Sequence, residues 1–509
     1  MPAKIAKVVV GIALSVAGVL LLRSAWDSLS WRYVLDSPIM VYAGFLLDHG
    51  YIPYRDFFDM NVPGTYFIMW FMGQVFGWGD TAFRASDLIC LGIISASTFF
   101  WMRRFGLFAA IAASIAFPLW YLGYGSHFSM QREYLALVPL ALLLVVATVP
   151  TGLGPVLRFI LSGILTAAVV LIKPQFFLLA LPVVIVLILE SSTSTRRRWL
   201  RLGLAGGFIL PCLATFLYLV VTGALSPFLD IVANYWPLYT GLTRYHEPIG
   251  GWDRVTYILL STIYGLTMFY LPAAVAGLIV LFRDDEKKRD AVMITGILAA
   301  AAIYPALGGQ FFGYHWIPFN YVAICATSLA ARTLTGETFD VKAAVPVVLV
   351  LFMLLSLSTI SYERIGVSWK GFGGEEVVSN GVPDGVNEFL SDRMQPGDLV
   401  QPLDWTSGAV HGMLMAQARP ATRFIYDFHF YHHVSDPYIA ALRQEFMREL
   451  SAKMPRFIIQ VLDKRPWPKG EDTSRQFPGL TSFLQQNYMI AKRGRTYLIF
   501  ERRDAMPGL

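Results

Sequence analysis

Apolar residues form long runs through most of the first 360 positions, and charged residues gather in the short gaps between them. Such runs are typical of membrane-spanning helices, which need roughly 20 mainly apolar residues to cross the hydrocarbon core. The pattern predicts about eleven spans. They are Ile5–Leu22, Ala85–Met102, Leu107–Leu122, Tyr134–Val149, Phe159–Ile172, Phe176–Leu189, Leu202–Val221, Tyr257–Phe282, Ala291–Leu307, Ile317–Ala331 and Ala343–Ile360.

Composition agrees with this pattern, because 55% of the 509 residues are hydrophobic and only 15% are charged. Lys4 and Lys7 precede the first apolar run as in a signal peptide, but no small-residue cleavage site follows, so we interpret this run as a retained helix. The three cysteines, Cys90, Cys212 and Cys325, all fall within predicted spans, which favours neither a disulfide framework nor a zinc site. The class is therefore a polytopic α-helical membrane protein.

Basic residues distinguish the two sides of the membrane. With the amino terminus inside, alternate loops carry the basic clusters, which are Arg103–Arg104, Arg158, Arg196–Arg198 with Arg201, Arg283 with Lys287–Arg289, and Arg332 with Lys342. Lys and Arg prefer cytoplasmic loops, so these clusters are expected inside. The net charge of +6 is then explained by topology and anionic membrane lipid, with no nucleic-acid partner.

Composition changes after Ile360, where charged residues, Pro and Gly become frequent. We expect residues 1–360 to form the transmembrane domain, with an outer loop at 23–84, and residues 361–509 to form an extracytoplasmic α/β domain. Periodicity predicts strands at Asp398–Leu403, Arg423–Phe428, Arg456–Leu462 and Thr496–Glu501, and helices at Val386–Met394 and Pro437–Met454. An odd number of spans places this domain outside.

The outer loop is unusually acidic and aromatic. Between Leu35 and Phe67 it carries Asp36, Asp48, Asp56, Asp59 and a histidine. Two amphipathic helices are expected in it, at Asp36–His49 and Gly64–Gly77. Acidic groups beside lipid are costly, so they point to a metal, a proton acceptor or a polar substrate.

Other polar residues at span ends fall on the same predicted outer side. They are Asn61, His127, Gln131, Arg132, Glu133, Lys173, Gln175, Asn234, Arg244, His246, Glu247, Gln310, Tyr314 and His315. We expect one outward-facing polar cavity, covered by the C-terminal domain. His429, His432 and His433 match no metal-ligand spacing, and we interpret them as surface histidines.

Several short motifs resemble those of the GT-C glycosyltransferases that use polyprenyl-phosphate sugars, such as protein O-mannosyltransferases and lipid A aminoarabinose transferases. The motifs are Leu35-Asp36-Ser37, the stretch from Gly50 to Asp56, the stretch from Asp59 to Tyr66, Gln131-Arg132-Glu133, Lys173-Pro174-Gln175 and Gly313-Tyr314-His315-Trp316. The order of spans and the C-terminal outer domain are similar too. The chain departs from the family at Ser37, where Glu is frequent, and at Asn61, where Lys or His is common.

The resemblance implies a GT-C fold and transfer of a hexosyl or pentosyl group from a polyprenyl-phosphate donor to a glycan, lipid or protein acceptor outside a bacterial inner membrane. Asp36 is then the expected base, with Asp59 the next candidate, and Lys173 and Arg132 hold the donor phosphate. Expected substrate contacts come from Tyr54, Arg55, Asn61, Gln131, Glu133, Gln175, His246, Tyr314 and His315. Tyr66, Trp236 and Trp316 join Tyr54 as candidate stacking platforms for a sugar. A divalent metal is a possible cofactor, and no nucleotide-binding fingerprint is present.

Other interpretations stay open at this level. Asp59 can pair with Arg55, Arg132 can pair with Glu133, and Lys173 can extend its ammonium group to the membrane interface. A transporter or lipid flippase without covalent chemistry is the main alternative for the whole chain, although we find neither inverted repeats nor a polar path to both faces. A glycan polymer ligase keeps the lipid-linked substrate and moves a larger group.

Overall fold

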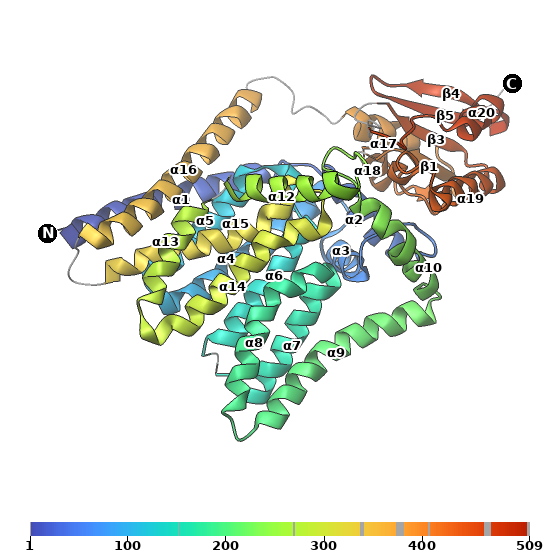
Figure 1. The fold of residues 1–509 in the computed structure, drawn as a ribbon. Helices are drawn as coiled ribbons and strands as arrows, with labels where there is room; N and C mark the ends of the chain where they lie inside the picture. The colour runs from blue at the N-terminus through green and yellow to red at the C-terminus, as the bar shows by residue number, and fades with distance from the viewer. Residues whose placement is uncertain are drawn as a thin grey trace. The chain divides into compact units, whose positions relative to one another are not determined.

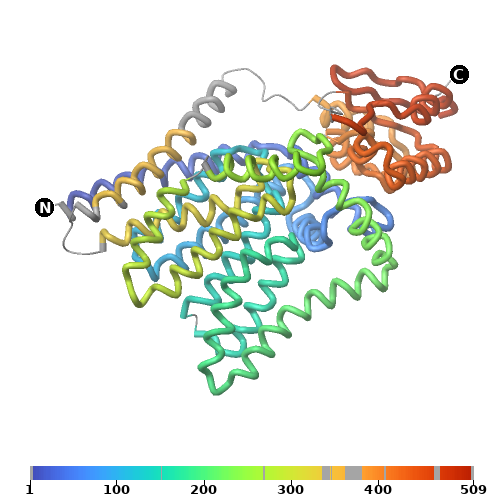
Figure 2. Tube along the Cα trace, in the orientation of Figure 1, coloured from blue at the N-terminus to red at the C-terminus, as the bar shows by residue number. Residues whose placement is uncertain are grey.

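The structure is a computed structural model that describes residues 2–150, 152–267, 270–335, 341–372, 381–405, 408–462 and 470–505. The chain divides into two compact units. Unit 1 contains residues 1–31, 84–215 and 258–374, and unit 2 contains residues 32–83, 216–257 and 375–509. Figures 1 and 2 show the elements of both units along the chain. The predicted domain boundary at residue 360 lies within one long helix, and the contacts group the C-terminal segment with the first outer loop.

Unit 1 is helical. Its helices, three of which continue into unit 2, are α1 (Pro2–Ser28), α4 (Asp80–Met102), α5 (Leu107–Gly123), α6 (Arg132–Thr148), α7 (Pro155–Ile172), α8 (Phe177–Ser192), α9 (Arg197–Val221), α12 (Gly251–Thr267), α13 (Leu271–Phe282), α14 (Lys288–Gly308), α15 (Ile317–Ser328) and α16 (Val341–Phe372). Each predicted span coincides with a helix except Tyr257–Phe282, which the structure divides between α12 and α13. These helices bend by 68° relative to each other. Pro272 opens α13, and proline cannot donate the hydrogen bond that a continuous helix requires.

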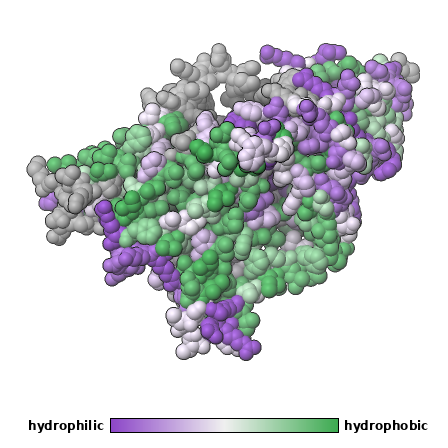
Figure 3. All heavy atoms as spheres, in the orientation of Figure 1, coloured by the Kyte–Doolittle hydropathy of each residue, from purple (hydrophilic) through white to green (hydrophobic). Residues whose placement is uncertain are grey.

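Helix length and composition confirm a polytopic membrane protein. Among the described residues, six helices are long and apolar enough to cross a membrane, or seven if the bent pair forms one span. Hydrophobic side chains cover most of the helical surface in Figure 3, and hydrophilic residues gather at the α8–α9 and α13–α14 turns. Such a surface suits lipid along the helices and a polar interface at their ends.

Close helix packing in unit 1 depends on glycine. A Cβ atom at Gly207 of α9 would lie 2.2 Å from the carbonyl oxygen of Ile160 in α7. A Cβ atom at Gly163 of α7 would lie 2.2 Å from the carbonyl oxygen of Leu204 in α9. Small residues allow backbones in membranes to approach this closely, so α7 and α9 are fixed against each other.

Unit 2 combines loop helices with a small α/β domain. Its helices are α2 (Ser37–Asp48), α3 (Pro63–Phe76), α10 (Leu225–Asp230), α11 (Trp236–Thr240), α17 (Gly381–Arg393), α18 (Gly408–Met415), α19 (Pro437–Lys453) and α20 (Pro478–Asn487). Its strands are β1 (Leu399–Leu403), β2 (Arg419–Pro420), β3 (Phe457–Val461), β4 (Tyr488–Arg493) and β5 (Tyr497–Arg502). The sheet order is β2-β1-β3-β5-β4, with β1 parallel to β2 and β3 and with β5 antiparallel to its neighbours.

The short helical turns complete the description. They are η1 (Arg103–Phe105), η2 (Ser126–Phe128), η3 (Pro174–Phe176), η4 (Ile231–Tyr235, a π-helix), η5 (Asp285–Lys287), η6 (Gly313–Trp316), η7 (Leu329–Thr335), η8 (Phe428–Phe430) and η9 (Arg503–Ala505).

Most of the sequence predictions for the small domain agree with the structure. The two loop helices, the two domain helices and three of the predicted strands are present with small shifts at their ends. The strand predicted at Arg423–Phe428 is wrong, because this apolar stretch runs as a buried loop into η8. Strand β4 was not predicted, since its pattern Tyr-Met-Ile-Ala-Lys-Arg lacks a clear alternation.

Candidate functional site

One buried polar cluster of unit 1 is the Glu133 cluster, which we define as Glu133, Lys173, Tyr304 and His315. Glu133 lies in the first turn of α6, and Lys173 follows the last residue of α7. Tyr304 belongs to α14, and His315 belongs to η6. Four separate elements therefore bring these side chains together.

One oxygen of Glu133, Oε1, is contacted by three neighbouring side chains. The ammonium group of Lys173 forms an ion pair with Oε1, and the hydroxyl group of Tyr304 donates a hydrogen bond to it at 2.8 Å. His315 Nε2 lies 3.5 Å from the same oxygen. Lys173 also lies 5.2 Å from the centre of the Tyr304 ring. The cluster is thus a compact ion pair held by a tyrosine and a histidine.

Several buried polar atoms around this cluster lack a hydrogen-bond partner among the described residues. They are Glu133 Oε2, His315 Nδ1, Gln131 Oε1 and Gln175 Oε1. Leaving a buried polar atom unpaired costs about 1–3 kcal/mol. This set of donors and acceptors is what a polar ligand or bound water would satisfy.

Positive charge exceeds negative charge here. Burial lowers the pKa of His315 to about 3, so the imidazole is neutral near pH 7. Glu133 is the one carboxylate in the Gln131–Glu133 and Lys173–Gln175 motifs, whereas Arg132 and Lys173 are both cationic. The half-buried Arg132 acts electrostatically on Glu133 along with Lys173. Two cationic side chains beside unpaired polar atoms are suited to an anion such as phosphate.

The sequence explains why Lys173 stands at this point. Pro174 cannot continue α7, and the residue before a proline is driven toward extended backbone. Lys173 has φ −153° and ψ 105°, which ends the helix. Its side chain is only 11% exposed and contacts Glu133. The alternative in which Lys173 merely extends toward the membrane interface is therefore wrong, and Glu133 pairs with Lys173 through this contact.

Asp36 lies in unit 2 at the start of α2. Leu35 before it has φ +54°, a left-handed backbone conformation that is uncommon for residues other than glycine. Asp36 occupies the N-cap position and is half-buried, with Ser37 and Pro38 opening the helix behind it. Asp48, at the other end of the same helix, is exposed and accepts a hydrogen bond from Gln74 at 2.5 Å.

The carboxylate of Asp59 accepts hydrogen bonds from several residues of the acidic loop and from Tyr426. Its Oδ1 accepts hydrogen bonds from the Met60 amide at 2.7 Å and the Tyr426 hydroxyl at 3.0 Å. Its Oδ2 accepts hydrogen bonds from Asn61 Nδ2 and the Tyr66 hydroxyl, both at 2.9 Å. A carboxylate with both oxygens occupied in this way is suited to positioning the loop, since no lone pair is directed to an empty space.

The remaining loop residues surround this carboxylate. Tyr54 is fully buried and donates to the Asn61 carbonyl oxygen at 2.5 Å. Arg55 pairs with Asp56 at 2.8 Å, so the alternative pairing of Arg55 with Asp59 is wrong. Trp236, a candidate stacking platform, donates its indole hydrogen to the Met60 carbonyl oxygen at 3.0 Å.

The other candidate residues have the following places. Tyr66 and Trp316 are buried, and Tyr314 lies with its ring centre 4.8 Å from that of His315. Gln131 is fully buried and donates to the His127 carbonyl oxygen at 3.4 Å. His246 has its ring centre 4.7 Å from Trp405 and 5.0 Å from Phe428. The structure therefore groups Gln131, Tyr314 and His315 with unit 1, and His246 with the aromatic residues of unit 2.

The interpretation of His429 and His432 as surface histidines is wrong, because both side chains are buried among aromatic rings. Among the described residues, no group of three or more His, Cys, Asp or Glu side chains is placed to hold a metal ion. The predicted divalent metal therefore stays a prediction.

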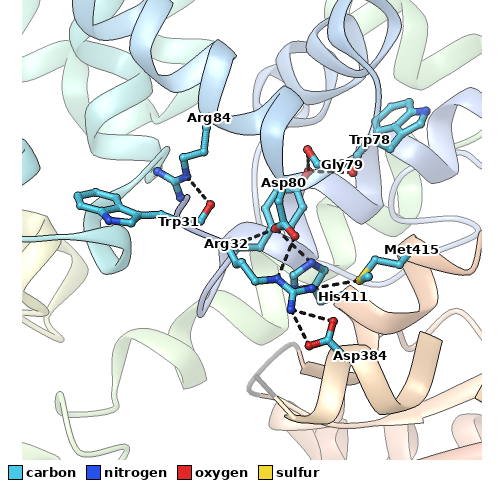
Figure 4. Close-up of polar contacts among 10 residues, drawn as sticks. Trp31, Arg32, Trp78, Gly79, Asp80, Arg84, Asp384, His411 and Met415 are labelled. Atoms are coloured by element: carbon cyan, nitrogen blue, oxygen red, sulfur yellow. Dashed lines mark hydrogen bonds and ion pairs between the residues drawn. The ribbon is translucent and has the colours of Figure 1, made fainter. Parts of the chain in front are cut away.

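A second ion-pair network connects the first outer loop with the C-terminal domain inside unit 2 (Figure 4). Arg32 donates to Asp80 at 3.1 Å and to both oxygens of Asp384. His411 Nε2 lies 3.3 Å from Asp80 Oδ1. The hydroxyl group of Tyr33 donates to the carbonyl oxygens of Trp78 and Gly79 at 2.9 and 3.0 Å. The loop that begins with Asp36 is thus anchored at both ends.

Sequence reasoning missed Tyr304, Tyr426, Trp405 and the Arg32 network. Tyr304 is a polar aromatic residue within the apolar run Ala291–Leu307, which was a usable signal. Tyr426 lies in the stretch that was misinterpreted as a strand, and its partner Asp59 is 367 positions away. No spacing rule connects residues at such a separation.

Comparison with known proteins gives matches at the level of structure. No protein-family model matches the chain, and no curated protein matches its sequence. The structure is similar to that of ArnT from Cupriavidus metallidurans bound to undecaprenyl phosphate, with a TM-score of 0.59 and 16% identity, over 97% of this chain and 98% of that chain. It is also similar to ArnT from the same organism in the apo state, with a TM-score of 0.55 and 13% identity, over 98% of each chain. The chain therefore shares the fold of these two structures, which agrees with the resemblance of its motifs.

Proposed function

We propose that this chain is an integral membrane glycosyltransferase that moves a sugar from a polyprenyl-phosphate donor to an acceptor outside the cytoplasm. The observation that carries the proposal is the Glu133 cluster, where cations and unpaired buried polar atoms meet in one place. The fold supports the same conclusion, because a neighbour with this fold is bound to undecaprenyl phosphate.

Lys173 and Arg132 are the proposed ligands of the donor phosphate. A phosphate bears more charge than a single cation neutralises, and charge-assisted hydrogen bonds to it are the strong ones. Glu133 holds Lys173 in place through their ion pair, and Tyr304 orients the carboxylate. Glu133 Oε2 and neutral His315 are the candidate partners for sugar hydroxyl groups or for the phosphate hydrogen-bond network.

Asp36 is the proposed base. In the transfer step an acceptor hydroxyl oxygen bonds to the anomeric carbon of the sugar, and the bond from that carbon to the phosphate oxygen breaks. The electron pair of the broken bond leaves with polyprenyl phosphate, and the acceptor proton goes to the Asp36 carboxylate. Lys173 and Arg132 stabilise the charge that develops on the leaving phosphate.

The proposal places the acidic loop and the C-terminal domain outside a bacterial inner membrane, on the basis of the arginine clusters in alternate loops. Reporter fusions test this placement. A reporter joined after Lys370 is expected to be active on the outer side, and a cytoplasmic signal from that fusion contradicts the topology.

The direct test of function is to incubate the purified protein with a panel of polyprenyl-phosphate sugars and measure free polyprenyl phosphate. Release that depends on an added glycan, lipid or protein acceptor supports sugar transfer. Movement of lipid between leaflets without release indicates the transporter or flippase alternative. Transfer of a preformed polymer in place of a single sugar indicates a ligase.

A further inference from the structure

A second polar site lies within unit 1 at the far ends of the helices that carry the Glu133 cluster. A cavity of about 530 Å³ is lined by residues from the end of α6, the start of α7, the end of α8 and the start of α14. Glu133 stands at the opposite end of α6, a helix of 17 residues. At 1.5 Å rise per residue the two sites are about 25 Å apart along that helix.

Two arginine–carboxylate ion pairs form part of the cavity wall. Arg104 pairs with Asp290 and donates to the Thr148 carbonyl oxygen at 2.9 Å. Arg158 pairs with Glu190 at 2.6 Å and donates to the Ala147 carbonyl oxygen at 2.9 Å. Both arginines are therefore held in fixed orientations at the carboxyl end of α6, where cations are favoured.

Four basic side chains line the cavity, together with three acidic ones, Glu190, Glu286 and Asp290, so one positive charge remains. Glu190 serves two arginines, because Arg289 also lies 3.9 Å from its carboxylate. Lys287 lines the cavity and makes no ion pair with another described residue. Arg158 Nε is buried without a hydrogen-bond partner in the described part of the chain. A net positive charge and spare donors in one cavity favour an anionic group that accepts several hydrogen bonds.

Apolar side chains next to the cavity indicate where such an anion comes from. Three apolar side chains are about half exposed or more: Leu157 at 47%, Leu189 at 59% and Val292 at 62%. Each lies within two sequence positions of a residue that lines the cavity. On a membrane protein such side chains contact acyl chains. Basic pockets between membrane helices are known to hold lipid headgroups.

We propose that this cavity binds the phosphate of a glycerophospholipid headgroup, with the acyl chains lying along α7, α8 and α14. Lys287 and Arg289 contact the phosphate from the α14 side, and Arg158 Nε contacts it from the α7 side. The site is separate from the proposed donor site, and its occupancy does not require glycosyl transfer.

Native mass spectrometry of the full-length, delipidated protein tests the proposal. The detergent-solubilised protein is titrated with phosphatidylglycerol or phosphatidylethanolamine, and in a separate arm with inorganic phosphate. The Lys287→Gln/Arg289→Gln variant is expected to bind the lipids about tenfold more weakly, since it loses charge-assisted contacts. Arg197→Gln, at an exposed arginine outside the cavity, is the matched control and is expected to bind as the wild type does.

Equal lipid affinity in the double variant and the wild type overturns the proposal. Saturation by inorganic phosphate with no retained lipid also overturns it, because the ligand is then a soluble phosphate compound. A melting temperature within 2 °C or so of the wild type confirms that the double variant is folded. If that variant unfolds, Lys287→Gln alone serves in its place, because Lys287 makes no ion pair with another described residue.

Discussion

Arg32 donates hydrogen bonds to both carboxylate oxygens of Asp384, at 2.8 and 2.7 Å, across 352 positions of sequence. The first residue of unit 2 is thereby connected to α17 of the C-terminal domain (Figure 4). The same guanidinium group donates to Asp80, and Asp80 also accepts a hydrogen bond from the Tyr33 amide at 2.9 Å. The contacts that flank Asp36 therefore also fix the C-terminal domain.

Removing this anchor is expected to lower stability moderately. Both side chains of the Arg32–Asp384 pair are partly exposed, at 22% and 41%, so solvent screening reduces the contribution. We expect Arg32→Gln to cost about 1 kcal/mol, measured as a lower melting temperature of the purified protein. Arg55→Gln is the control, because among the described residues Arg55 pairs with its sequence neighbour Asp56 and with a backbone carbonyl. Equal effects of the two changes contradict the anchoring role.

Two adjacent glycines in α9 are expected to respond in opposite ways. Gly207→Ala places a methyl group 2.2 Å from a backbone carbonyl oxygen of α7, whereas an alanine at Gly206 meets nothing within 4 Å. We expect Gly207→Ala to destabilise the protein by about 1–3 kcal/mol, and Gly206→Ala to be neutral or slightly stabilising. Thermal unfolding in detergent compares them. Similar melting temperatures for both variants refute the close approach of α7 and α9.

Acid is expected to destabilise unit 2. Burial, with the nearby charge of Arg423, lowers the pKa of His429 to about 3 from its ordinary 6.5. Below about pH 6.5 this histidine binds a proton in the unfolded chain but not in the folded chain. The free energy of unfolding therefore decreases as the pH falls from about 6.5 toward 3. For one such group the loss at pH 5 is about 2 kcal/mol.

The measurement is the melting temperature between pH 8 and pH 5 for the wild type and His429→Gln. The variant is expected to lose less stability on acidification than the wild type does. A parallel loss in His429→Gln and the wild type means that this histidine does not cause the pH dependence.

Hydropathy located the helices of unit 1, because the driving force is local. Among the described residues, however, six helices, or seven with the bent pair, are long and apolar enough to span a membrane, against about eleven predicted spans. At Tyr257–Phe282 the apolar run did not reveal the break between two helices that precedes Pro272. The strand predicted at Arg423–Phe428 failed for a related reason. The ring of Phe424 in this stretch packs against Phe58 and Phe446, and a sequence pattern does not distinguish that burial from a strand.

Candidate site residues could be identified from sequence, but their partners could not. Lys173 and Glu133 were both singled out, yet their ion pair joins two helices and depends on how α6 and α7 pack. A pair between Arg132 and Glu133, which are adjacent in sequence, was an open alternative. The role of Asp59 was likewise open until Tyr66 and Tyr426 were found on its two oxygens.

The phosphate assignment predicts weaker donor binding without Lys173. Lys173→Ala alone leaves Glu133 buried and unpaired, which threatens the fold, so the test includes the neutral pair Lys173→Met/Glu133→Gln. Both variants are expected to bind a polyprenyl-phosphate sugar about tenfold more weakly or worse. Lys453→Ala, at an exposed lysine, is the control. Unchanged donor affinity in the folded Lys173 variants removes the assignment.

Transfer by Asp36→Asn is the most direct test of the proposed chemistry. This change keeps the size of the side chain but removes the charge and basicity that proton abstraction needs. In the acceptor-dependent assay for free polyprenyl phosphate, we expect the rate to fall by about a hundredfold to ten-thousandfold, with donor binding intact. Asp48→Asn, at the exposed end of the same helix, is expected to stay within a few fold of the wild type. Near-normal transfer by Asp36→Asn, or no acceptor-dependent release by the wild type, contradicts the account.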